Sequence, residues 1–181
     1  MQATVVLLGD TGYARLTVEA IAARAGVGKQ TIYRWWERGK PAVVLDALAE
    51  DVATGPVALP DTGNLEADLR VVIRATVAEF ADPKLSATTR ALTVETLVDD
   101  ELAGQVRDRL LRPHLDAVRE RIEVARDAGQ VRAGADLDQA VESIFGPIFH
   151  RWLLRTGPLT DEYADGLLDH VMAAVRPNRA E

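Results

Sequence analysis

Lys29, Gln30, Thr31 and Tyr33 have side chains that can hydrogen-bond to duplex DNA, and all four lie between positions 29 and 33. Gln pairs bidentately with adenine, Lys bonds to the acceptors of guanine, and the methyl group of Thr contacts the thymine methyl. Tyr and Arg side chains add hydrogen bonds to phosphate. The surrounding stretch IAARAGVGKQTIYRWW, residues 21–36, contains no carboxylate. These residue types indicate a contact with the major groove of DNA.

Two short helices are expected to hold these side chains. Residues 18–25 and 29–36 have helical apolar spacing, and only residues 26–28, two of them glycine, separate them. A helix pair with a tight, glycine-containing turn is the helix-turn-helix motif, whose second helix enters the major groove. The residues expected to pack inside the motif are Val18, Ile21, Ala22, Ala25, Val27 within the turn, and Ile32 with one tryptophan.

The ends of these helices suit phosphate. Thr17 is a predicted N-cap and Gly26 a predicted helix stop. The free N–H groups at a helix N-terminus bind phosphate, which makes Thr17 a candidate contact. Arg34 and one tryptophan flank the second helix; we expect Trp36 in the core and Trp35 at the DNA. The alternative is a solvated amphipathic helix whose aromatic side chains belong to the core.

The charge of the chain is unevenly distributed. The formal net charge is −7, yet residues 11–41 contain six basic and two acidic residues, a local +4. Beyond residue 50 there are 15 Lys and Arg against 23 Asp and Glu. Such a chain can present one basic face to a polyanion while its acidic remainder limits non-specific binding. Chance clustering of charge is the alternative.

The string LTVEAIAARAGVGKQTIYRWW resembles the N-terminal signature of the TetR family of bacterial transcriptional regulators, over roughly the first fifty residues. The specific pattern is T-x-x-x-I-A-x-x-A-G-V-x-x-x-T-I-Y. Residues from Phe80 onward are similar to the C-terminal domain of a large TetR subfamily common in high-GC bacteria. The resemblance implies an all-helical homodimer, in which a three-helix head binds DNA and a larger domain dimerises and often binds an effector that releases the DNA.

The resemblance also assigns roles to single residues. It implies phosphate contacts for Thr17, Tyr33 and Lys40. Groove-facing positions are implied for Gly28, Lys29, Gln30, Thr31 and Arg34. Family members commonly have the lysine one position nearer to the aromatic residue, so either Lys40 contacts phosphate through a bulged loop or Arg38 replaces it. The chain also starts where the first helix of the family is under way, so the basic arm is expected to be missing.

The apolar periodicity predicts an all-α fold in two domains, a helix-turn-helix head over residues 1–49 and a helical effector-binding and dimerisation domain over residues 50–181. Two prolines and two glycines interrupt the helical pattern around residues 55–64. The predicted helices span residues 2–8, 18–25, 29–36, 41–53, 65–81, 84–98, 101–128, 137–155 and 161–175.

A wide apolar stripe along the last two helices predicts a four-helix dimer interface, with the subunit core as the alternative. Its predicted members are Ile144, Phe145, Ile148, Leu167, Leu168, Val171, Met172 and Val175. Symmetry would place two recognition helices about one DNA turn apart, on an inverted-repeat operator. Pro113 and Pro147 should kink their helices and leave room for a small apolar effector. The predicted pocket lining is Phe80, Leu92, Glu95, Phe149, His150 and Trp152.

Other classes of function are disfavoured. The chain has no cysteine, which excludes thiol chemistry and fits a reducing cytoplasm. No apolar run approaches the roughly 18 to 20 residues of a membrane span, and TVVLLG is too short for an export signal. No catalytic motif, cofactor or metal site is expected. Two alternatives to a regulator stay open: a protein-interaction module that has lost DNA binding, and a cation-dependent hydrolase using Asp161, Asp165 and Asp169.

Overall fold

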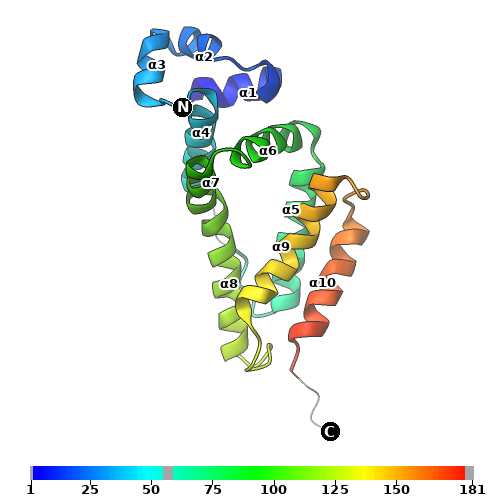
Figure 1. Cartoon of the computed structure of the whole chain (residues 1–181). Coiled ribbons are helices and arrows are strands. Elements are labelled where there is room, and N and C mark those ends of the chain that lie inside the picture. The colour runs from blue at the N-terminus through cyan, green and yellow to red at the C-terminus, as the bar shows by residue number, and fades with distance from the viewer. Residues whose placement is uncertain (1, 55–58, 178–181) are drawn as a thin grey trace. The chain divides into compact units, whose positions relative to one another are not determined.

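The computed structural model describes residues 2–54 and 59–177, and every regular element in these ranges is a helix, which confirms the all-α fold class (Figure 1). The helices are α1 (Gln2–Arg15), α2 (Val18–Ala25), α3 (Lys29–Trp35), α4 (Lys40–Thr54), α5 (Leu65–Ala81), α6 (Pro83–Thr96), α7 (Asp100–Val106), the π-helix η1 (Arg107–Leu111), α8 (Arg112–Asp127), α9 (Leu137–Leu154) and α10 (Asp161–Val175).

The described residues form two compact units. The first unit contains residues 2–54 and 83–113, and the second contains residues 59–82 and 114–177. The sequence-based division at residue 49 separates α6, α7 and η1 from the head, whereas Leu92 and Leu102 pack against Leu45 of α4. This packing joins segments far apart in the chain, so local periodicity could not reveal it. Part of the predicted break around residues 55–64 lies outside the described residues.

Helix α1 extends further than the sequence predicted. Gly9 and Gly12 have low helix propensity and suggested an end at residue 8. Instead the helix passes Gly9 and is kinked at Gly12, which has non-helical φ and ψ of 73° and 164°, and helical residues resume after the kink up to Arg15. Leu8, Tyr13 and Leu16 are all buried in the core of the first unit. Tertiary packing therefore holds the residues on both sides of the kink against this core.

The second unit is built around α5. Helix α10 packs along α5, and α9 contacts both of them (Figure 1). The core contains Leu69 and Ile73 from α5, Ile122 from α8, Ile144 from α9 and Leu168 from α10, each at most 1% exposed. These residues recur at helical spacing, so each helix buries one apolar stripe.

A π-helix replaces part of the long helix predicted for residues 101–128. Within η1 the N–H of Arg112 donates to the carbonyl of Arg107, five residues earlier. Pro113 follows directly and has no N–H to donate, so the backbone pattern must change near it. The irregularity expected at Pro113 thus lies in the turn before it. Pro147 lies inside α9, which continues on both sides of it.

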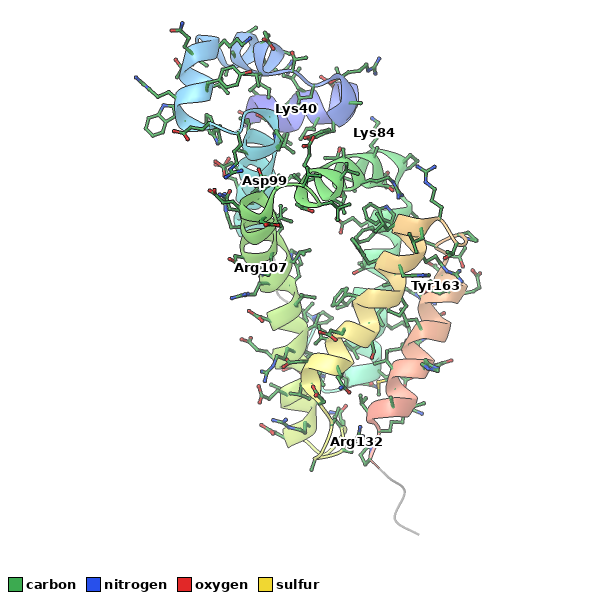
Figure 2. The ribbon with its side chains drawn as sticks, in the orientation of Figure 1. Lys40, Lys84, Asp99, Arg107, Arg132 and Tyr163 are labelled. Atoms are coloured by element: carbon green, nitrogen blue, oxygen red, sulfur yellow. The ribbon has the colours of Figure 1, made fainter. Side chains whose placement is uncertain are left out.

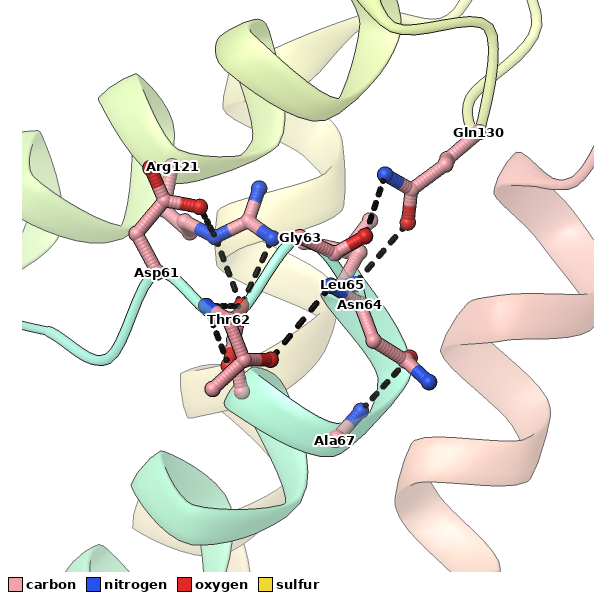
Figure 3. A network of polar contacts seen from close by, with 9 residues as sticks. Asp61, Thr62, Gly63, Asn64, Leu65, Ala67, Arg121 and Gln130 are labelled. Carbon is pink, nitrogen blue, oxygen red and sulfur yellow. Dashed lines mark hydrogen bonds and ion pairs between the residues drawn. The ribbon is translucent and has the colours of Figure 1, made fainter.

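A buried polar network joins α5, α8 and the loops before α5 and after α8 (Figure 3). The Nη2 and Nε atoms of Arg121 donate to Asp68 Oδ2 over 2.6 and 2.9 Å. Thr62 Oγ1 donates to the other carboxylate oxygen over 2.7 Å. Gln130 accepts from the N–H of Leu65 and donates to the carbonyl of Gly63. The network fixes the start of α5 against α8.

Candidate nucleic-acid interface

Helix α3 is anchored on its inner side and exposed on its outer side. Ile32 is 4% exposed and packs with Val18, Ile21 and Ala22 of α2. Trp36 packs against the same core, and its Nε1 donates to Asp46 Oδ2 of α4 over 2.6 Å. Trp36 is therefore the tryptophan that completes the motif, as the sequence predicted. The anchored helix presents its remaining side chains to solvent.

The residues predicted to read DNA lie together on this helix. Gly28, Lys29, Gln30, Tyr33 and Arg34 are exposed. The neighbouring Thr31 is partly buried, and Trp35 is 70% exposed. The ring of Tyr33 lies 5.6 Å from Lys29 Nζ, and the ring of Trp35 lies 6.0 Å from the guanidinium of Arg34. This face combines cations, an amide, a hydroxyl and two aromatic rings, which can bond both base edges and phosphates.

Thr17 caps α2 as predicted. Its Oγ1 accepts a hydrogen bond from the N–H of Ala20 over 3.1 Å, and Gly26 ends α2 in the left-handed region with a φ of 69°. Thr17 is exposed beside free N–H groups of the first turn, where an anion is stabilised by the helix dipole. The exposed Arg24 of α2 has no ion pair among the described residues. Arg24 contributes to the local positive charge of residues 11–41, but local spacing assigns it no contact.

Arg38 and Lys40, the two alternatives for a further phosphate contact, both have partners within the first unit, where Figure 2 labels Lys40 and Asp99. The guanidinium of Arg38 forms ion pairs with Asp99 and Glu101. Lys40 Nζ donates to the carbonyl of Tyr13 over 3.3 Å and lies 4.1 Å from the centre of its ring. Both cations thus have intramolecular partners outside α3.

Tyr13 explains why Lys40 is held there. Its hydroxyl donates to Glu95 Oε1 over 3.2 Å, and burial together with the negative charge of Glu95 raises the pKa of Tyr13. The neutral ring can therefore accept the ammonium of Lys40 on its face at any ordinary pH. No local sequence signal could reveal this contact, because Tyr13 and Glu95 lie 82 positions apart.

Lys29 also has an intramolecular partner. Its ammonium forms an ion pair with the carboxylate of Glu19 on α2, and both side chains are at least half exposed. The hydrogen bond from Lys29 lowers the pKa of Glu19, and the same contact raises the pKa of Lys29. Both charges are included in the local charge of residues 11–41, but the sequence pattern did not predict that the two residues form a pair.

Two expectations about the turn were wrong. Ala25 is exposed and Val27 is 41% exposed, whereas both were expected to face inward. They line a shallow apolar groove together with Ala3, Ile32 and Trp35. The reason is that the inward face of α2 ends before Gly26, where the chain reverses its direction.

The residues predicted for the dimer interface contribute to the core of the second unit. Seven of the eight are at most 9% exposed within the single chain, and Phe145 is partly buried against the same core. Within one subunit these side chains therefore pack mainly on their own core, which was the alternative given for the stripe, and an interface through α9 and α10 stays a prediction. The stripe is broad because α5 and α8 pack on it in addition to the other helix of the pair.

The predicted pocket residues fall into two groups. Phe80, Phe149 and Trp152 lie together in the second unit, with ring centres 4.8 Å apart for Phe80 and Trp152 and 5.3 Å apart for Phe149 and Trp152. His150 is exposed on α9. Leu92 and Glu95 belong to the first unit, where Leu92 is core and Glu95 binds Tyr13.

The acidic residues of α10 do not form a metal site. Asp165 accepts hydrogen bonds from Arg70 and Arg74, and these arginines lower its pKa. Throughout residues 2–54 and 59–177, no group of three histidines or carboxylates is arranged to hold a metal ion. Asp165, one of the three carboxylates that a cation-dependent hydrolase would use, is thus paired with arginines. Over the same residues, no helix is long and apolar enough to cross a membrane.

Comparison with known proteins gives the same assignment for both parts of the chain. Residues 1–47 match the family described as bacterial regulatory proteins, tetR family. Residues 59–171 match the family described as the tetracyclin repressor-like C-terminal domain. The solved structure of the TetR family transcription regulator SCO0332 superimposes with a TM-score of 0.81 at 30% identity, covering 97% of this chain and 95% of that one.

Individual relatives agree. The HTH-type transcriptional regulator YdeS of Bacillus subtilis is 31% identical over 96% of this chain and 86% of its own length. A protein named DNA-binding transcriptional repressor TetR, from Mycobacteroides abscessus, is 29% identical over 95% and 89%. The structure of a complex of SmeT with triclosan is similar with a TM-score of 0.60 at 26% identity, over 98% and 90% of the two chains. With an anchored helix-turn-helix and both domains matched, the chain belongs to the TetR family of bacterial transcriptional regulators.

Proposed function

We propose that this protein is a repressor that binds an inverted-repeat operator as a homodimer, with α3 of each subunit in the major groove. The observation that supports this most is the exposed face of α3, held by the buried Ile32 and by the hydrogen bond from Trp36 to Asp46. A rigidly seated helix can present Gln30 and Tyr33 to DNA at little entropic cost. The relative from Mycobacteroides abscessus is named a repressor, which favours this direction of regulation.

The homodimer would use surfaces that the subunit core leaves exposed. On α9 these include Gly146 and Phe149, and on α10 they include Gly166, His170 and Ala173. Gly166, His170 and Ala173 follow the i, i+4, i+7 spacing of one helical face. Their small or flat side chains let a second subunit approach closely. A two-fold interface through this face would pair identical surfaces.

We further propose that a small apolar ligand releases the DNA. The cluster of Phe80, Phe149 and Trp152 brings three aromatic rings together in the second unit, which a small apolar ligand could contact. The similar protein SmeT is described in complex with triclosan, a ligand of that chemical class. A ligand acts in this way only if it binds one arrangement of the helices more tightly than the other.

Selection of bound duplexes from a random pool tests the proposal. We expect an inverted repeat with half-sites about one helical turn apart, and loss of binding at raised salt. Tyr33→Ala and Gln30→Ala should each weaken operator binding by roughly tenfold, which corresponds to about 1.4 kcal/mol. The control Arg119→Ala removes a partly exposed cation of α8 that is paired with Glu123 and Asp138, and it should leave affinity unchanged. A folded protein that selects no duplex would instead favour the protein-interaction module.

A further inference from the structure

We infer that Glu19 is a specificity-determining residue: by pairing with Lys29, it prevents this lysine from acting as a sequence-independent phosphate contact and reserves it for a base edge. The inference rests on the proposed function, because it concerns how α3 discriminates between operator and other DNA. It assigns a role in recognition to an acidic residue within a basic head.

The geometry supports a direct competition between Glu19 and DNA. Lys29 is the first residue of α3, where side chains reach base edges, and Glu19 is in the first turn of α2. The two side chains are bonded to one another although both are exposed, at 60% for Glu19 and 50% for Lys29. DNA that approaches Lys29 must therefore either leave this pair intact or replace the carboxylate.

The strength of the pair decides which kind of DNA can replace the carboxylate. Exposed ion pairs are weak, so a well-placed acceptor can exchange with Glu19. Guanine offers two acceptors, O6 and N7, to one lysine and can compensate for the lost partner. A single phosphate brings its own negative charge next to Glu19, which opposes the exchange. Glu19 therefore penalises the non-specific mode more than the specific one, as repulsive elements of selective interfaces do.

The other cations of the head make this selectivity necessary. Arg24 and Arg34 are exposed without an ion pair among the described residues, and they can attract any duplex. An additional free lysine on α3 would strengthen this attraction regardless of sequence. Pairing Lys29 lowers the basal affinity and leaves its donors available where guanine is present.

The experiment compares Glu19→Gln with wild type on two duplexes, one selected from a random pool by the wild-type protein and a scrambled duplex of equal composition. We expect affinity for the scrambled duplex to rise about fivefold and the slope of log affinity against log salt to steepen by about one unit, as for one more phosphate contact. Affinity for the selected duplex should change less, so the ratio of the two affinities falls.

Glu37→Gln is the matched control. Glu37 is the other carboxylate within residues 11–41, is exposed, and has no ion pair among the described residues. The Glu37→Gln substitution removes the same charge without freeing Lys29, so the ratio of the affinities for the two duplexes should remain near that of wild type. In a Lys29→Gln background the effect of Glu19→Gln should shrink to that of the control.

Each outcome decides the matter. Equal gains on both duplexes, equal effects of the two glutamate variants, or an effect that persists without Lys29 would overturn the role of Glu19. If the wild-type protein selects no duplex from the pool, the proposed function itself is contradicted. This outcome is seen with the wild-type protein alone, before any variant is measured, so it is distinguishable from a failure of the role of Glu19.

Discussion

Asp68 and Arg121 form an ion pair that is almost completely removed from solvent, with exposures of 1% and 5%. Burial by itself would raise the pKa of Asp68, but hydrogen bonds from Thr62 and from Arg121 outweigh burial and lower it. The pair is sustained by four donor groups, the N–H and hydroxyl of Thr62 and the Nε and Nη2 of Arg121, which form five hydrogen bonds to the carboxylate of Asp68 (Figure 3). A buried charge stays ionised only when it is matched in this way.

Asp68→Asn should destabilise the protein by about 3 kcal/mol at neutral pH, because it leaves the charge of Arg121 buried without a partner. Since the folded-state pKa of Asp68 lies below its unfolded value, its contribution is present above the unfolded value and is lost as pH falls through the folded value. The difference from wild type should therefore shrink in acid. Urea denaturation at several pH values measures this.

The matched control at the same site is Asp61→Asn. Asp61 also contacts Arg121, with 3.4 Å between Nε and Oδ1, but it is 61% exposed. Its replacement should change stability by less than about 1 kcal/mol. Equal losses for the two variants would contradict the importance of burial.

At the scale of elements, the turn between α2 and α3 decides how α3 is presented. Gly26 has a φ of 69°, and its N–H bonds to the carbonyls that end α2. Gly28 has an ordinary φ of −73° and precedes α3 without a side-chain cap. Only the first glycine is required by backbone conformation, because residues with a Cβ are strained at positive φ.

Gly26→Ala should lower stability by about 1 kcal/mol through this strain and should weaken DNA binding by displacing α3. Gly28→Ser should preserve or raise stability, because a serine hydroxyl can cap the free N–H groups of α3. Thermal denaturation followed by circular dichroism compares the two. The opposite order of stabilities would disprove this account of the turn.

At the scale of the whole molecule, the proposed recognition of an inverted repeat needs a second subunit. Most apolar side chains of the α9 and α10 stripe are buried in the core of one subunit. The surface that we propose for dimerisation includes the exposed residues Gly146 and Gly166. A Cβ added at either glycine would meet no heavy atom within 4 Å. Substitution there is tolerated by the subunit, which makes these positions suitable for testing the interface.

Gly166→Arg should convert the dimer to a monomer and reduce operator affinity by more than tenfold, because half of the contacts are lost. Subunit stability should not fall, since glycine is a poor helix former. Val124→Arg, at a 51% exposed position of α8, is the control and should remain dimeric. Analytical ultracentrifugation gives the assembly state. If the Gly166→Arg protein remains a dimer, the interface does not include Gly166.

Features that depend on neighbouring residues were determined by the sequence. The bounds of α2, α5 and α10 follow from apolar periodicity and from the caps Thr17, Asn64 and Thr160. The residues of the recognition face followed from the same local spacing. The family could be predicted because its signature lies in one contiguous stretch, and the matches to both family domains confirm it.

Only the tertiary structure decided which partner each charged or apolar side chain meets. It pairs Lys29 with Glu19, Arg38 with Asp99 and Asp68 with Arg121. It also buries the stripe of α9 and α10 within the subunit and joins α6 to the head. Helical spacing determines which residues share a face, but it carries no information about which distant segment covers that face.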